Sequence, residues 1–81
     1  MRSVYIVRCS DDTLYTGIAK DVEQRVWNHN NAKVWAKYTK SRRPVTLVRS
    51  KRKRDRANAS KLELQIKAYP REKKEALIRK G

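Results

Sequence analysis

Five side chains in this sequence are of types that carry ionic and acid–base chemistry, and they could act together if folding gathers them. Tyr5 and Tyr15 lie in runs of strand-forming residues, and Arg25 and His29 are four residues apart, so they share one helical face. Glu63 is a carboxylate in a later helical stretch. A guanidinium offers a fixed fork of donors that suits phosphate oxygens, and an imidazole titrates near neutral pH.

Each of these residues also has a purely structural explanation. Tyrosines on strands usually pack, half-buried, against their neighbours. Arg25 could pair with Asp21, and Glu63 with Lys67, because both pairs have i,i+4 spacing. His29 could close a helix or sit in the core. No single residue is therefore specific, and only the combination indicates a site.

A central strand and a hairpin would position the two tyrosines. Residues 3–9 predict a strand, and its centre is apolar on both faces, so it should be central and covered on both sides. A turn cluster, Ser10-Asp11-Asp12-Thr13, leads into a second strand over residues 14–18. These two strands should form a hairpin.

Helices and a third strand follow. Residues 21–31 predict a helix in which Asp21 is the N-cap, Gln24 occupies the capping-box position, and Val22 and Val26 face inward. Residues 45–48 predict the third strand, residues 50–56 a basic loop, and residues 57–68 a second helix. Pro70 should open a short third helix.

The predicted fold is a single α+β domain over residues 1–81. It consists of a three-stranded antiparallel sheet flanked by helices, in the order β-β-α-β-α-α. The helix of residues 57–68 carries an apolar stripe at i, i+3, i+7 and i+10, formed by Ala59, Leu62, Ile66 and Tyr69. A chain of 81 residues has apolar material for only one modest core.

Net charge indicates a polyanionic partner. Lys and Arg total 22 against 8 Asp and Glu, which gives a formal net charge of +14. Such a field attracts nucleic acid, whose neutralisation releases counterions. An acidic membrane surface is the competing partner, but it calls for an amphipathic helix with large apolar residues, which the sequence lacks. Binding to a ribosome-like assembly is left open by charge alone.

Cysteine and histidine usage excludes other classes. One cysteine, Cys9, and one histidine allow neither an internal disulfide nor a zinc site built from cysteine pairs. The apolar run from Val4 to Val7 is too short for a signal peptide or a membrane span. We therefore expect a cytoplasmic protein that does not bind membranes and needs no small-molecule cofactor.

Two basic segments are expected to contact nucleic acid, around residues 33–43 and 49–56. Trp35 and Tyr38 could stack on bases, although Trp35 could equally pack in the core, and Trp27 is expected to pack. Gly17 would allow close approach of a substrate backbone or simply serve a turn. The full set of predicted contacts is Gly17, Lys33, Trp35, Lys37, Tyr38, Lys40, Arg42, Arg43, Arg49, Lys51, Arg52, Lys53 and Arg54.

Taken jointly, the motifs resemble the GIY-YIG endonuclease superfamily, in its small stand-alone bacterial branch. The half-motifs are Ser3-Val4-Tyr5 and Tyr15-Thr16-Gly17, followed by Arg25 and His29 at the family spacing. Residues 38–48 and 62–67 extend the resemblance, which covers roughly residues 3–78. Ser3 replaces the first glycine, Ala19 stands where threonine is common, and an asparagine found after the metal-binding glutamate in several branches is not evident.

The resemblance implies a metal-dependent DNA endonuclease, with DNA favoured over RNA, acting in DNA repair or recombination. Glu63 would hold Mg²⁺ or Mn²⁺, and Arg25 would stabilise the phosphate. Tyr15, with Tyr5 beside it, would orient or deprotonate the attacking water, and His29 is the alternative base. A nucleic-acid-binding module that cuts weakly or not at all is the main alternative. An interaction or assembly protein is the third.

Overall fold

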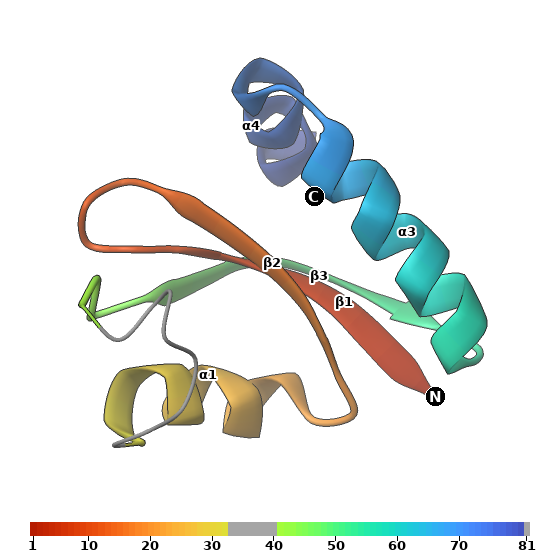
Figure 1. Ribbon diagram of the computed structural model, residues 1–81, viewed down its shortest axis with the longest axis horizontal. Helices are drawn as coiled ribbons and strands as arrows, with labels where there is room; N and C mark the ends of the chain where they lie inside the picture. Colours follow the sequence, from red (N-terminus) through yellow and green to blue (C-terminus); the bar gives the residue numbers. More distant parts are fainter. Residues whose placement is uncertain (33–40, 81) are drawn as a thin grey trace.

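The computed structural model describes residues 1–32 and 41–80 of the 81-residue chain. Three strands, β1 (Arg2–Arg8), β2 (Leu14–Ala19) and β3 (Thr46–Lys53), form an antiparallel sheet in the order β2-β1-β3. The helices are α1 (Val22–Asn31), α3 (Arg56–Ala68) and α4 (Arg71–Lys80). The predicted α+β class and the order β-β-α-β-α-α are confirmed (Figure 1).

Strand β1 is the centre of the sheet, as its apolar residues predicted. Side chains alternate between the two faces of a strand, so Tyr5 and Val7 enter one core cluster and Val4 and Ile6 the other. The first cluster includes Val22 and Val26 of α1, and the second includes residues of α3 and α4. Helix α1 therefore covers one face of the sheet, and α3 and α4 lie on the other (Figure 1).

Local capping fixes where α1 begins. The Asp21 carboxylate accepts a hydrogen bond from the backbone N–H of Gln24 at 3.1 Å, as predicted. The Gln24 side chain instead donates to Asn28, so the return bond of a capping box is replaced. The prediction that Trp27 packs is wrong: its side chain is 58% exposed on the outer face of α1.

The far end of α1 is held by the chain that enters β3. The Arg43 guanidinium donates to the carbonyls of His29 and Ala32 at the end of the helix. Asn30 exchanges two hydrogen bonds with the backbone of Val45, at 3.0 and 2.7 Å. These contacts set the orientation of α1, and with it the positions of Arg25 and His29.

Strand β3 is longer than predicted. The basic run beginning at Ser50 was predicted as a loop, yet β3 continues to Lys53 and pairs with β1 throughout. A strand at the sheet edge tolerates charged residues, because they project into water and discourage edge-to-edge association. Pairing with the apolar β1 therefore outweighs the polar composition of this stretch.

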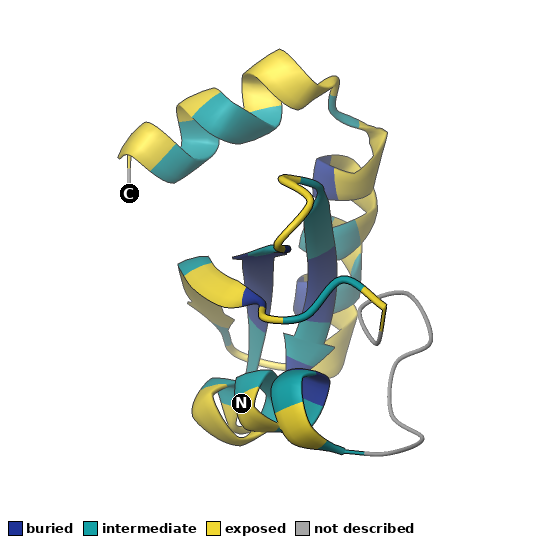
Figure 2. Ribbon diagram, turned by 90° about the vertical axis from the view of Figure 1, so that its left-hand side faces the viewer, coloured by how far each residue is buried: buried dark blue, intermediate teal, exposed yellow. Residues whose placement is uncertain are grey.

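Helix α3 packs its predicted apolar stripe against the sheet, where Ala59 and Ile66 are buried with Leu62 and Tyr69 beside them. Helix α4 contributes Leu77 and Ile78, and its outer face is exposed (Figure 2). No helix within residues 1–32 and 41–80 is long and apolar enough to cross a membrane.

Candidate active site

A pocket of about 360 Å³ opens beside β2 and is lined from both sides of the sheet. Tyr5, Tyr15, Arg25 and Glu63, four of the residues predicted from sequence, line it together. The remaining lining residues are Arg2, Gly17, Ile18, Arg56 and Ser60. Residues 58 positions apart in the chain, Tyr5 and Glu63, thus meet at one space.

The position of β2 at the sheet edge explains this convergence. Arg25 projects from α1 on one face of the sheet, and Glu63 from α3 on the other. An edge strand leaves its outer side uncovered by a further strand, so the two helices can present side chains to the same space beside β2. The tyrosines reach it from within the sheet, since Tyr5 pairs with Gly17 and Tyr15 with Val7.

Gly17 makes room for the ring of Tyr5. A Cβ atom at Gly17 would lie 2.6 Å from the Tyr5 hydroxyl oxygen and 2.8 Å from Cζ, closer than packed atoms allow. The glycine lies inside β2 rather than in a turn, and the space above it is filled by the phenol of its cross-strand partner. Packing of Tyr5 is therefore the structural reason for Gly17, whereas its predicted contact with substrate stays a prediction.

His29 lies behind Tyr5 and does not line the pocket. Its Nε2 atom is 2.8 Å from the Tyr5 hydroxyl oxygen, and both side chains are only 1% exposed. The imidazole also meets the Tyr15 ring edge-on, with ring centroids 5.3 Å apart. The histidine thus supports both phenols from the core side.

Arg25 completes a directed hydrogen-bond chain. Its guanidinium donates to the Tyr5 hydroxyl. A guanidinium can only donate, so the Tyr5 oxygen accepts from Arg25, and the phenol donates to Nε2 of His29 when the imidazole carries its proton on Nδ1. The chain runs from the pocket, through the phenol, to the buried imidazole.

Burial sets the protonation states of this chain. Desolvation, with a smaller contribution from Tyr15, raises the pKa of Tyr5 to about 12 although Arg25 opposes the shift. Burial, followed by the charges of Arg25 and Arg43, lowers the pKa of His29. Tyr5 is therefore protonated at neutral pH, and His29 is neutral.

Glu63 brings the carboxylate to the pocket. Its side chain is 20% exposed and forms an ion pair with Lys67 at 3.2 Å, the i,i+4 alternative foreseen from sequence. No group of three His, Cys, Asp or Glu side chains within the described ranges could form a metal cage. Mg²⁺ commonly keeps several waters and takes one or two carboxylates together with substrate phosphate. A pocket with one accessible carboxylate and the nearby Ser60 hydroxyl fits that mode of binding.

Two pocket residues, Arg2 and Ser60, were missed by sequence reasoning, and Arg56 was predicted only as the end of the basic segment 49–56. Arg56, Ser60 and Glu63 have i, i+4 and i+7 spacing and therefore share one face of α3. That spacing was a usable signal, but the basic run was assigned to a loop. Arg2 carried no such signal, because only the sheet register places it.

Several of the described basic residues predicted to bind nucleic acid make contacts within the protein. Arg42 pairs with Asp11 at 3.0 Å, Arg43 caps α1, and Arg49 donates to the Leu77 carbonyl. Along β3, Lys51 and Arg52 point to opposite faces because side chains alternate. Lys33, Trp35, Lys37, Tyr38 and Lys40 lie outside the described residues. The nucleic-acid contacts of the whole predicted set, which includes Lys53 and Arg54, stay predictions.

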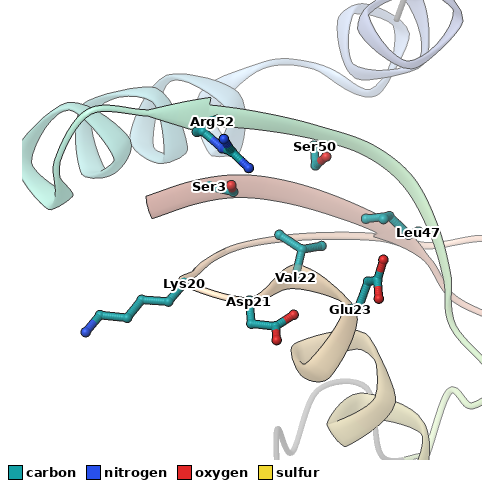
Figure 3. A pocket seen from close by; sticks show the side chains of 8 residues that line it. All are labelled: Ser3, Lys20, Asp21, Val22, Glu23, Leu47, Ser50 and Arg52. Carbon is teal, nitrogen blue, oxygen red and sulfur yellow. The ribbon is translucent and has the colours of Figure 1, made fainter. Parts of the chain in front are cut away.

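A second hollow lies on the other side of α1 (Figure 3). Arg52 and Lys20 supply its positive charges, and Asp21 and Glu23 supply an equal number of negative ones. Ser3, Ser50, Val22 and Leu47 complete the lining. Its charges cancel, so it offers little attraction to a polyanion, unlike the pocket beside β2.

Comparison with known proteins adds independent information. A family model described as the GIY-YIG catalytic domain matches residues 1–76. A UPF0213 protein of Staphylococcus epidermidis is 53% identical over 78 residues, covering 96% of this chain and 94% of its own. A Staphylococcus aureus UPF0213 protein is 54% identical over 76 residues, covering 94% and 92%. The solution NMR structure of a Bacillus halodurans UPF0213 protein superposes with a TM-score of 0.63 and 36% identity, covering 98% of this chain and 84% of that one.

Proposed function

Since the chain belongs to the GIY-YIG catalytic domain family, a nuclease-type family that binds nucleic acid, we propose that it is a divalent-metal-dependent DNA endonuclease. The observation that carries the proposal is the convergence of Tyr5, Tyr15, Arg25 and Glu63 on one pocket. Those side chains supply an anion-binding fork, two phenols and a carboxylate, which are the groups that phosphodiester hydrolysis requires.

Arg25 binds and polarises the scissile phosphate in this proposal. Its guanidinium lines the pocket and offers donors to the phosphoryl oxygens as negative charge develops on them. The hydrogen bond to Tyr5 holds the side chain in place before substrate arrives. Mg²⁺ or Mn²⁺ at Glu63 would supply further positive charge for the phosphate and the leaving oxygen.

The Tyr5–His29 pair accepts the proton of the attacking water. His29 does not line the pocket, whereas Tyr5 does. As the Tyr5 oxygen takes a proton from water, its own proton passes to Nε2 of neutral His29. The phenol therefore never becomes a phenolate, a form that its raised pKa disfavours. Tyr15 orients the water from the other side of the opening.

A cleavage screen tests the proposal. The purified protein is incubated with branched, single-stranded and duplex DNA and RNA in Mg²⁺ or Mn²⁺, alongside Glu63→Gln and Arg25→Gln. We expect the wild type to cut and each variant to lose about 100-fold or more in rate, with unchanged circular dichroism. Equal cleavage by wild type and both variants would assign the activity to a contaminant. The preference for DNA and a role in repair or recombination stay predictions, the first of which this screen addresses.

A binding module that cuts weakly or not at all is the second candidate, and one contact favours it. The Glu63 carboxylate already has a cationic partner in Lys67, which competes with any metal ion. In that case affinity for nucleic acid falls steeply with salt, and Glu63→Gln leaves that affinity intact. The purified wild-type protein then binds nucleic acid without nicking it.

A further inference from the structure

The pocket beside β2 contains more positive charge than one phosphate diester needs. Arg2, at the start of β1, and Arg56, in the first turn of α3, line it together with Arg25. The only carboxylate in the lining is Glu63. A phosphodiester carries a single negative charge, which Arg25 and a metal ion at Glu63 would already neutralise.

Neither of the two additional guanidinium groups forms an ion pair in the described part of the chain. Within residues 1–32 and 41–80, no carboxylate lies within ion-pair distance of Arg2 or Arg56. By contrast, Arg8, Arg42 and Arg71 are all paired with acidic side chains. Arg2 also stands opposite Lys53 in the sheet register, which adds to the positive charge at this end of β1.

Spacing along a nucleic-acid strand makes a neighbouring phosphate the natural ligand. Each strand carries a negative charge about every 3.4 Å along the helix axis, so a strand that enters the pocket brings the next phosphate with it. Two guanidinium groups can share that phosphate through their planar forks. Ser60, one helical turn from Arg56 on the same face of α3, adds a hydroxyl donor.

We propose that Arg2 and Arg56 form a subsite for the backbone phosphate adjacent to the scissile one. The inference rests on the proposed function, because it takes Arg25 and Glu63 as the groups at the bond to be cut. It assigns the substrate to internal linkages of a polynucleotide strand. A dinucleotide with one phosphodiester lacks the second anchor and is a poor substrate.

Binding tests the subsite without requiring cleavage. Affinity for a single-stranded oligonucleotide is measured by fluorescence anisotropy across a salt series, for Glu63→Gln and for the same protein with Arg2→Gln and Arg56→Gln added. Arg79→Gln with Lys80→Gln, in the same Glu63→Gln background, is the matched control, because these exposed residues at the end of α4 lose the same two charges outside the pocket. We expect the double change to weaken binding by about tenfold or more. It should also reduce the salt slope by about 0.7, the value for one single-strand phosphate contact.

Cleavage of substrates in which one phosphate is replaced by a neutral methylphosphonate locates the subsite. In the chain with native Glu63, a methylphosphonate beside the cut site should lower kcat/KM, and the same substitution should cost the Arg2→Gln, Arg56→Gln protein nothing further. If the wild type cleaves robustly and the Arg2 and Arg56 variants match the Arg79 and Lys80 control in affinity and kcat/KM, the subsite is wrong and the nuclease proposal stands. If the Arg2 and Arg56 changes weaken binding but no protein cleaves, the subsite stands and the nuclease proposal is wrong.

Discussion

The Tyr5 hydroxyl oxygen lies 2.8 Å from Nε2 of His29, and both side chains are almost completely buried. The imidazole therefore reaches the pocket only through the phenol. Gly17, directly opposite Tyr5 on β2, leaves the space that the ring occupies. This three-residue arrangement decides which groups can meet a substrate, and most of the following predictions depend on it.

Replacing Tyr5 by phenylalanine should remove the proton path and keep the fold. The ring still fills the space over Gly17, but no hydroxyl remains to take a proton from water or pass one to His29. We expect the cleavage rate to fall about 100-fold or more and stability to fall by about 1 kcal/mol. Tyr69→Phe, in the second core cluster and outside the pocket, is the control and should cleave normally. Equal rates for the two variants would exclude Tyr5 from the chemistry.

Acidification should stop cleavage and lower stability through His29. Its pKa in the folded protein lies below 6.5, so the rate should rise with pH through that lower value and then level off. The unfolded chain takes up a proton near pH 6.5 and the folded chain does not, so the free energy of unfolding should decrease as pH falls below about 6.5. Both effects should disappear in His29→Gln, measured by gel assay and urea unfolding. A pH profile that His29→Gln retains would point to another group.

Adding one methyl group at Gly17 should displace Tyr5. The new Cβ would lie within 3 Å of the phenol, so Gly17→Ala should cost about 1–3 kcal/mol in urea unfolding and reduce cleavage as well. Ser50 is the other cross-strand neighbour of Tyr5, and it is exposed. Ser50→Ala should therefore leave the free energy of unfolding nearly unchanged. Wild-type stability in Gly17→Ala would mean that the sheet adjusts without strain.

Removing Lys67 should strengthen metal binding. Its Nζ atom lies 3.2 Å from the Glu63 carboxylate and competes for it. Exposed ion pairs contribute up to about 1 kcal/mol, so Lys67→Gln should tighten Mg²⁺ or Mn²⁺ binding by up to about fivefold in titration calorimetry without nucleic acid. Lys61→Gln, also exposed on α3, removes the same charge without touching Glu63. An equal gain in both variants would attribute the effect to overall charge alone.

The attachment of α4 should be acid-sensitive. Glu75 bonds Arg8 and Arg71, which hold the pKa of its carboxyl at about 2 instead of 4.5. A lowered pKa contributes stability that is present above about pH 4.5 and is lost as pH falls through about 2. Glu75→Gln should therefore melt below the wild type at pH 7, and the gap should close between those two values. Glu72→Gln, also exposed on α4, should show no such closing gap.

Much of the fold could be predicted because local patterns encode it. The apolar centre of β1 on both faces, the Asp21 cap and the spaced stripe of α3 follow from residue type and period alone. The extension of β3 through Lys53 could not be predicted in this way, because its stability comes from pairing with a distant strand. The exposure of Trp27 likewise depends on how far α1 covers the sheet.

The candidate site could likewise be predicted only in part. The sequence by itself determined which chemical groups were available and, through the motifs, which family they resembled. Only the tertiary structure decided that His29 contacts the Tyr5 hydroxyl and that the Tyr5 ring packs over Gly17. It also decided that Arg2 and Arg56 line the same pocket. Those relationships depend on strand register and on helices from opposite faces meeting at the edge of β2. Neither is encoded in the spacing of neighbouring residues, because both arise from contacts between distant segments.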